Sequence, residues 1–263
     1  MAQLRCNFFS DVLGLSTSMT VILPQATREQ IGMTGRGSAT GAPVLYLLHG
    51  LSDDDTIWAR RTSIERYAAA KGLAVVMPRV ERSLYSDEVH GGAYWTFLSE
   101  ELPAVVADLF RVSSAREDTF VAGLSMGGYG AFQWALRAPE RFAAAASLSG
   151  LLDVATRQEA AVGHGDDRRD PLFRRVFGEA SVRGSDSDLL ALLERSDAAA
   201  LPALYLACGD ADELLSDNLA FLAAAEAAGV RVDATLDDGG HTWDYWDRHI
   251  ERVLDWLPLR AVG

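Results

Sequence analysis

The segment over residues 119–130 reads T-F-V-A-G-L-S-M-G-G-Y-G and constrains the fold more than any other stretch. An apolar run over 120–122 predicts a buried strand, and residues 129–137 have the composition of a helix that ends before Pro139. Between them lies G-x-S-x-G, with glycines two before and two after Ser125, where strand and helix must approach closely. We therefore predict a nucleophile elbow with Ser125 as the nucleophile, the alternative being a serine that only caps the helix.

The composition narrows the class of protein. The 263 residues suit a large α/β domain, and 49% hydrophobic with 23% charged residues is typical of a soluble globular protein. The net charge of −13 argues against nucleic acid and anionic membranes as partners. We expect Cys6 and Cys208 to be free thiols, and the absence of a signal-like apolar stretch in MAQLRCNFFS predicts a cytoplasmic protein.

Short apolar runs alternate with helical patterns along the chain. The predicted strands are 4–9, 18–23, 44–48, 73–77, 120–122, 142–148, 203–208 and 231–236. The predicted helices are 64–71, 94–110 with a bend near Pro103, 129–137, 214–228 and 243–256. This alternation predicts one α/β domain over 1–263, with a mostly parallel central sheet and helices on both faces. Residues 25–42 are expected to form a loop, and 151–200 an irregular excursion or small cap within the domain.

A serine nucleophile needs a neighbouring base and an acid that orients the base. Of the five histidines, His241 follows the last predicted strand in the glycine-loosened segment D-G-G-H-T-W, so we predict that it is the base. His249 falls within the final helix, where we expect it at the surface. The acid should follow the strand 203–208, and there the spacing leaves both Asp210 and Asp212 open.

The oxyanion formed during acyl transfer needs two backbone N–H donors. We predict Met126, directly after the nucleophile, and Leu51, in the loop after strand 44–48, where Gly50 permits close approach. His49 is expected to brace this turn. No H-E-x-x-H, Cys/His cluster, P-loop or dinucleotide motif occurs, so no metal or cofactor is predicted; the segment H-G-D-D-R-R-D-P over 164–171 is expected to be a solvated acidic loop.

These residues together resemble a known group, the esterase-D-like esterases, and most closely its small tributyrin-type members. The motifs are F-F-S-D-V-L-G over 8–14, L-L-H-G-L-S over 47–52, A-G-L-S-M-G-G-Y-G over 122–130, C-G over 208–209 with Asp212, and G-H-T-W over 240–243. The resemblance implies an α/β-hydrolase fold without cofactor. It also implies a triad of Ser125, His241 and Asp212, with Leu51 and Met126 as oxyanion donors. S-formylglutathione hydrolases, more distant members, carry a longer loop after the H-G pair.

The predicted function is hydrolysis of small, short-acyl carboxylic esters through a covalent acyl-enzyme. Aromatic rings near the predicted strand ends could wall a small acyl pocket, for which we predict Trp58, Tyr85 and Trp243 together with Gly50. The alternatives are an acyltransferase or a thioesterase similar to S-formylglutathione hydrolase, using the same triad, or a non-catalytic binding module on this fold. A small-molecule ester is the expected partner, and a homo-oligomer is compatible with the sequence.

Overall fold

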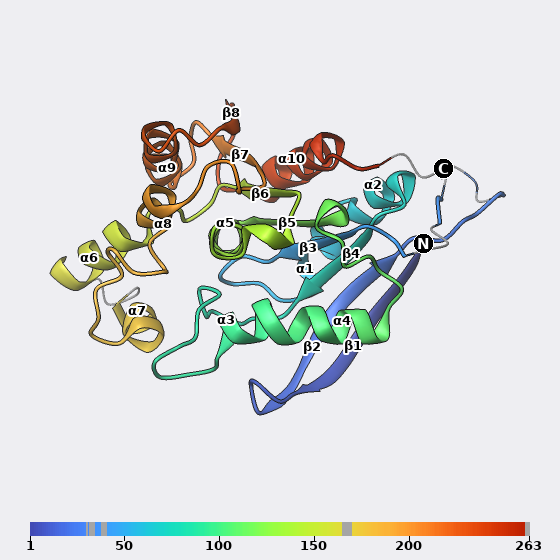
Figure 1. Ribbon diagram of the computed structural model, residues 1–263, viewed down its shortest axis with the longest axis horizontal. Coiled ribbons are helices and arrows are strands. Elements are labelled where there is room, and N and C mark those ends of the chain that lie inside the picture. Colours follow the sequence, from blue (N-terminus) through green and yellow to red (C-terminus); the bar gives the residue numbers. More distant parts are fainter. Residues whose placement is uncertain (30, 32–34, 38–40, 165–169, 261–263) are drawn as a thin grey trace.

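In the described part of the chain, eight strands form one sheet in the order β1-β2-β4-β3-β5-β6-β7-β8 (Figure 1). The computed structural model describes residues 1–29, 31, 35–37, 41–164 and 170–260, so the predicted loops at 25–42 and 164–171 lie partly outside the described residues. The strands are β1 (Ala2–Ser10), β2 (Leu15–Leu23), β3 (Val44–Leu48), β4 (Ala74–Pro78), β5 (Thr119–Leu124), β6 (Ala144–Leu148), β7 (Ala203–Gly209) and β8 (Val232–Asp237). From β4 to β8 every neighbouring pair is parallel, whereas β2 runs antiparallel to both β1 and β4.

Helices cover both faces of the sheet, which confirms the predicted α/β class. Every residue of β3, β4, β5 and β6 is buried, as expected for continuous apolar runs in a parallel sheet. Side chains of α4 (Leu102–Leu109), α5 (Met126–Arg137), α8 (Leu189–Arg195) and α9 (Leu215–Ala227) share one core cluster. Those of α1 (Ile57–Arg61), α2 (Ile64–Lys71) and α10 (Trp243–Trp256) share the other.

The predicted helix over 94–110 is divided into three parts. A short α3 (Tyr94–Thr96) leads into a π-helical segment, Phe97–Glu101, before α4 begins at Leu102. Pro103 therefore occupies the first turn of α4, where its missing N–H costs little. The π-helical segment ends at Glu101, whose carboxylate accepts hydrogen bonds from the Asp11 backbone N–H at 2.7 Å and from the Ser10 hydroxyl. Through Glu101, the end of the π-helical segment is thus hydrogen-bonded to the β1–β2 turn.

The excursion segment, residues 151–200, contains more regular structure than predicted. It includes α6 (Val154–His164), α7 (Asp170–Phe177) and α8, so the expectation of an irregular segment is wrong. In α7 the apolar residues Phe173, Val176 and Phe177 have helical spacing, but Arg174 and Arg175 lie between them. The helix is also too short for its hydrophobic periodicity to be recognised from the sequence. Figure 1 shows α6 and α7 extending beyond the sheet.

His249 corrects another expectation, because it is fully buried rather than at the surface. It shares the buried face of α10 with Tyr245, Trp246 and Ile250. The Tyr245 ring stacks on its imidazole at 4.0 Å between centroids, and its Nε2 lies 3.2 Å from Asp237 Oδ1. Polar residues separate these positions in the sequence, so the apolar face of α10 that packs against the sheet was not recognised there.

Burial lowers the pKa of His249 to about 4, which predicts a dependence of stability on pH. In the unfolded chain a histidine titrates near about 6.5, so between these values the unfolded state binds the additional proton. The free energy of unfolding should therefore fall as the pH drops from about 6.5 to 4. Urea unfolding at several pH values should show this slope reduced in His249→Phe and retained after substitution of the exposed His90. Parallel curves for wild type and His249→Phe would contradict the assignment.

In the part of the chain that the structure describes, no helix combines the length and the apolar character needed to cross a membrane.

Candidate active site

Ser125 lies in a sharp turn between the end of β5 and the start of α5. Its backbone has φ 53° and ψ −116°, a conformation that a residue with a side chain rarely adopts. A Cβ added to Gly123 would lie 2.2 Å from the Gly127 carbonyl oxygen, and one added to Gly127 would lie 2.3 Å from that of Leu48. Only glycine fits at both positions, so the G-x-S-x-G spacing is a requirement of this turn.

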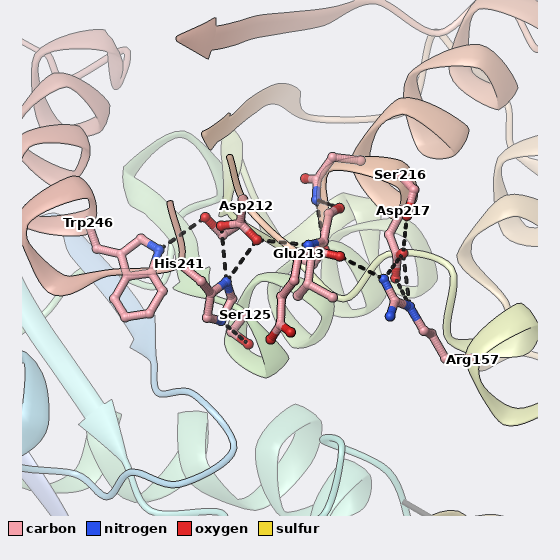
Figure 2. Close-up of polar contacts among 12 residues, drawn as sticks. Ser125, Arg157, Asp212, Glu213, Ser216, Asp217, His241 and Trp246 are labelled. Atoms are coloured by element: carbon pink, nitrogen blue, oxygen red, sulfur yellow. Dashed lines mark hydrogen bonds and ion pairs between the residues drawn. The ribbon is translucent and has the colours of Figure 1, made fainter. Parts of the chain in front are cut away.

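Three side chains from separate strand ends meet beside this turn (Figure 2). His241 Nε2 lies 3.1 Å from Ser125 Oγ, and His241 Nδ1 lies 3.0 Å from each carboxylate oxygen of Asp212. Asp210 is exposed and instead accepts a hydrogen bond from the Gly239 backbone N–H at 3.4 Å. Of the two aspartates that the spacing left open, Asp212 is the one in contact with His241.

The Asp212 carboxylate is buried but well supplied with hydrogen-bond donors. Burial alone would raise its pKa, yet the hydrogen bonds from His241, the Leu214 N–H and the Ser149 hydroxyl hold the pKa below its ordinary value. The Leu214 bond measures 2.8 Å. Asp212 is therefore kept ionised, the state in which it can orient His241 and stabilise its protonated form.

Sequence reasoning missed the two residues that support this carboxylate and the histidine. Ser149 is fully buried after β6 and has a positive φ of 50°, and its Oγ accepts a hydrogen bond from Trp246 Nε1 at 3.1 Å. The Trp246 ring also packs edge-on against His241, with centroids 4.8 Å apart. Neither residue belongs to a recognisable motif, since the contacts join β6, α10 and the His241 loop.

His49 braces the turn after β3, as predicted. Nδ1 of its buried ring lies 2.7 Å from the Gly50 carbonyl oxygen, and the Val80 backbone N–H donates a hydrogen bond to Nε2 at 3.1 Å. Burial lowers the pKa of His49, which favours the neutral ring that this arrangement needs. A Cβ on Gly50 would lie 2.7 Å from Leu124 Cδ1 and 2.9 Å from Asp53 Oδ2, so a side chain there would have to displace both.

A small cavity of about 110 Å³ opens at Ser125. Both predicted oxyanion donors, Leu51 and Met126, line it together with Ser125 and Glu213. Its other lining residues are apolar: Leu84, Leu151, Leu172, Phe173 and Leu214. Two of them, Leu172 and Phe173, come from α7. A larger, open hollow of about 530 Å³ lies between α5 and α8 and contains no residue of the Ser125–His241–Asp212 set. Ser125 is therefore accessible from the smaller cavity and not from the larger one.

The aromatic residues predicted for the acyl pocket lie elsewhere. Trp58 and Tyr85 are buried, with Trp58 Nε1 donating to the Leu48 carbonyl at 3.0 Å and the Tyr85 hydroxyl to that of His49 at 2.9 Å. Trp243 packs edge-on against Trp58, with centroids 5.5 Å apart. None of the three lines the cavity at Ser125. Their polar atoms and rings support the turn after β3 and the N-terminal end of α10. The periodicity of the sequence does not distinguish an aromatic residue in such a position from one in a pocket wall.

Among the described residues, no group of three or more histidine, cysteine, aspartate or glutamate side chains is arranged to hold a metal ion. Within the same residues the two cysteines are free, Cys208 being buried and Cys6 half-buried.

Comparison with known proteins agrees with this geometry. Residues 12–257 match the model of the family described as "Putative esterase". An acetyl esterase from Caldicellulosiruptor saccharolyticus is 31% identical over 98% of both chains. Among solved structures, FphF, a fluorophosphonate-binding serine hydrolase of Staphylococcus aureus, is 34% identical over 97% of this chain and 98% of its own, with a TM-score of 0.85. The S-formylglutathione hydrolase of the same organism is 33% identical with the same coverage and a TM-score of 0.81. The chain therefore belongs to this esterase family and is a serine carboxylic ester hydrolase with the α/β-hydrolase fold.

Proposed function

We propose that this esterase hydrolyses short-acyl esters through a covalent acyl-enzyme on Ser125. The observation that carries the proposal is the continuous chain Ser125–His241–Asp212, whose serine lines a small, mostly apolar cavity. The similarity to an acetyl esterase supports a short acyl group. The cavity would hold the acyl chain, and the alcohol would leave toward solvent.

The proposed reaction has two halves. Ser125 Oγ attacks the ester carbonyl carbon while its proton passes to His241 Nε2, 3.1 Å away. The backbone N–H groups of Leu51 and Met126 stabilise the resulting oxyanion, and the intermediate collapses as His241 returns the proton to the leaving alcohol oxygen. A water molecule then loses a proton to His241 and attacks the acyl-enzyme, releasing the carboxylic acid and restoring the serine hydroxyl.

The excursion segment is proposed to act as a small cap that limits acyl length. Its α7 supplies Leu172 and Phe173 to the cavity, and Phe173 is almost fully buried. The C-terminal part of α7 is held by backbone hydrogen bonds from Val89 to the Val176 carbonyl at 2.9 Å and from His90 to that of Arg175 at 3.0 Å. A wall fixed in this way cannot move aside without breaking these bonds.

Acyl-chain selectivity tests the proposal. Each methylene that fits the cavity should gain up to about 0.8 kcal/mol from burial, whereas one that does not fit should cost about 1–3 kcal/mol through overpacking. We expect kcat/KM on p-nitrophenyl esters of two to twelve carbons to be highest for acetyl to butyryl and then to fall sharply. Leu172→Ala should move the maximum to longer chains, whereas alanine at the exposed Leu109 should not. A wild-type maximum at eight carbons or more would show an open site instead.

Product analysis separates hydrolysis from acyl transfer. With added alcohols or thiols, a hydrolase should release mainly the free carboxylic acid, whereas an acyltransferase should form the new ester or thioester. Failure to turn over any short-chain p-nitrophenyl ester would favour the binding-module alternative.

A further inference from the structure

Among the residues that the structure describes, one charged side chain outside the triad lines the cavity at Ser125. Glu213, directly after Asp212, is exposed and contributes to a lining whose other members, apart from Ser125, are apolar. In Figure 2 its carboxylate projects on the side of Ser125, away from the Arg157 guanidinium. A carboxylate at this position is close enough to sense the charge of a bound substrate.

The backbone of Glu213 is held in place by its neighbours. Its carbonyl oxygen accepts a hydrogen bond from Arg157 Nη2 of α6 at 3.1 Å. On its other side the Leu214 N–H donates to Asp212 Oδ1 at 2.8 Å, so the turn that carries Glu213 is tied to both the excursion segment and the triad. These bonds restrict where the Glu213 side chain can reach and keep it at the cavity.

Arg157 attracts the Glu213 carboxylate, but its ion pair is with another carboxylate. The guanidinium forms a bidentate ion pair with the buried Asp217, with Nε 3.0 Å and Nη2 2.6 Å from Oδ1, and its hydrogen bond to Glu213 goes to the backbone carbonyl. Among the described residues no cation pairs with the Glu213 carboxylate, and the chain as a whole has a net charge of −13. Glu213 therefore places a carboxylate beside an apolar cavity, and its hydrogen-bonded partner Arg157 is engaged by Asp217.

We propose that Glu213 makes this site select neutral and cationic esters and reject anionic ones. The inference rests on the proposed function, because it assumes that esters react at Ser125. A substrate carboxylate bound near Glu213 would meet like-charge repulsion, and a substrate ammonium group would be attracted, whereas a neutral ester would experience neither effect. Glu213 is thus a specificity-determining residue that takes no part in bond making or breaking.

Three acetate esters of matched shape test the assignment: 4-acetoxybenzoate, its methyl ester, and 4-acetoxyphenyltrimethylammonium. For Glu213→Gln we expect the anionic-to-neutral ratio of kcat/KM to rise about three- to ten-fold and the cationic-to-neutral ratio to fall by a similar factor. Both changes should shrink between about 20 mM and 500 mM NaCl, because salt screens an exposed charge. Glu213→Lys should move both ratios further in the same directions.

Glu226→Gln provides the matched control, since Glu226 is an exposed glutamate near the opposite end of α9 and should leave all three substrates unaffected. Ratios that stay the same in Glu213→Gln, while the neutral ester is hydrolysed by wild type, would overturn the charge assignment and leave the proposed function standing. Failure of wild type to hydrolyse even the neutral ester would overturn the proposed function itself.

Discussion

Replacing Ser125 by alanine is expected to lower kcat for ester hydrolysis by about a million-fold, as in other serine triads. The proposed mechanism has no other atom that could form the acyl-enzyme, since Ser125 Oγ is the hydroxyl oxygen in contact with His241 Nε2. An alkyl fluorophosphonate should add once to the wild-type protein. Intact-protein mass spectrometry would count the adducts, and peptide mapping should place the label on the peptide that contains Ser125.

Two outcomes would refute the assignment of Ser125. One is an alanine variant that keeps substantial activity after removal of any wild-type contamination. The other is labelling of a different serine in the wild-type protein. Ser114→Ala, a serine away from the cavity at Ser125, is the control for a general effect of losing a hydroxyl.

The second large effect concerns the acid. Asp212→Asn should reduce kcat by roughly 10⁴. Both carboxylate oxygens of Asp212 lie 3.0 Å from His241 Nδ1, whereas an amide has one oxygen and no negative charge to stabilise the protonated imidazole. Asp210→Asn should have a much smaller effect, since Asp210 is exposed and contacts the Gly239 backbone instead. The substitution pair is well matched, because both aspartates lie in one turn after β7.

Steady-state rates at several concentrations of p-nitrophenyl acetate would give kcat for both variants. Circular dichroism would check that each variant remains folded. Equal losses in the two variants would point to a general disturbance of the turn. A larger loss in Asp210→Asn would mean that the histidine is oriented differently from its position in the structure.

Local patterns predicted the parts of this protein that depend on local geometry. The elbow was recognisable because its two glycines are required by contacts with the adjacent backbone, and this requirement appears directly as G-x-S-x-G. The central strands were equally clear, because burial on both faces demands continuous apolar runs. The choice between Asp210 and Asp212 was different: both follow β7, and spacing within one turn does not tell which carboxylate points to His241.

Features that depend on packing between distant segments could not be predicted. The rings of Trp58 and Tyr85 suit a pocket wall as well as a core, and only the fold shows that their polar atoms bond to backbone carbonyls at the end of β3 and directly after it. Glu213 and Phe173 face the cavity because two separate segments converge there. The burial of His249 depends on how α10 packs onto the sheet, which its polar neighbours in sequence obscure.

The strand order has a consequence for the synthesis of this enzyme. β4 pairs with β3 on one side and with β2 on the other, and β5 then pairs with the opposite edge of β3. From β5 to β8 each new strand pairs with the edge formed by the strand before it. A nascent chain, which is made from its N-terminus, can therefore extend the sheet as the ribosome delivers each strand. The Ser125 strand joins early, but His241 lies 116 residues further on, beyond β8. In the proposed mechanism the Ser125 hydroxyl has no base until that loop arrives, so we expect esterase activity only after the last strand has docked.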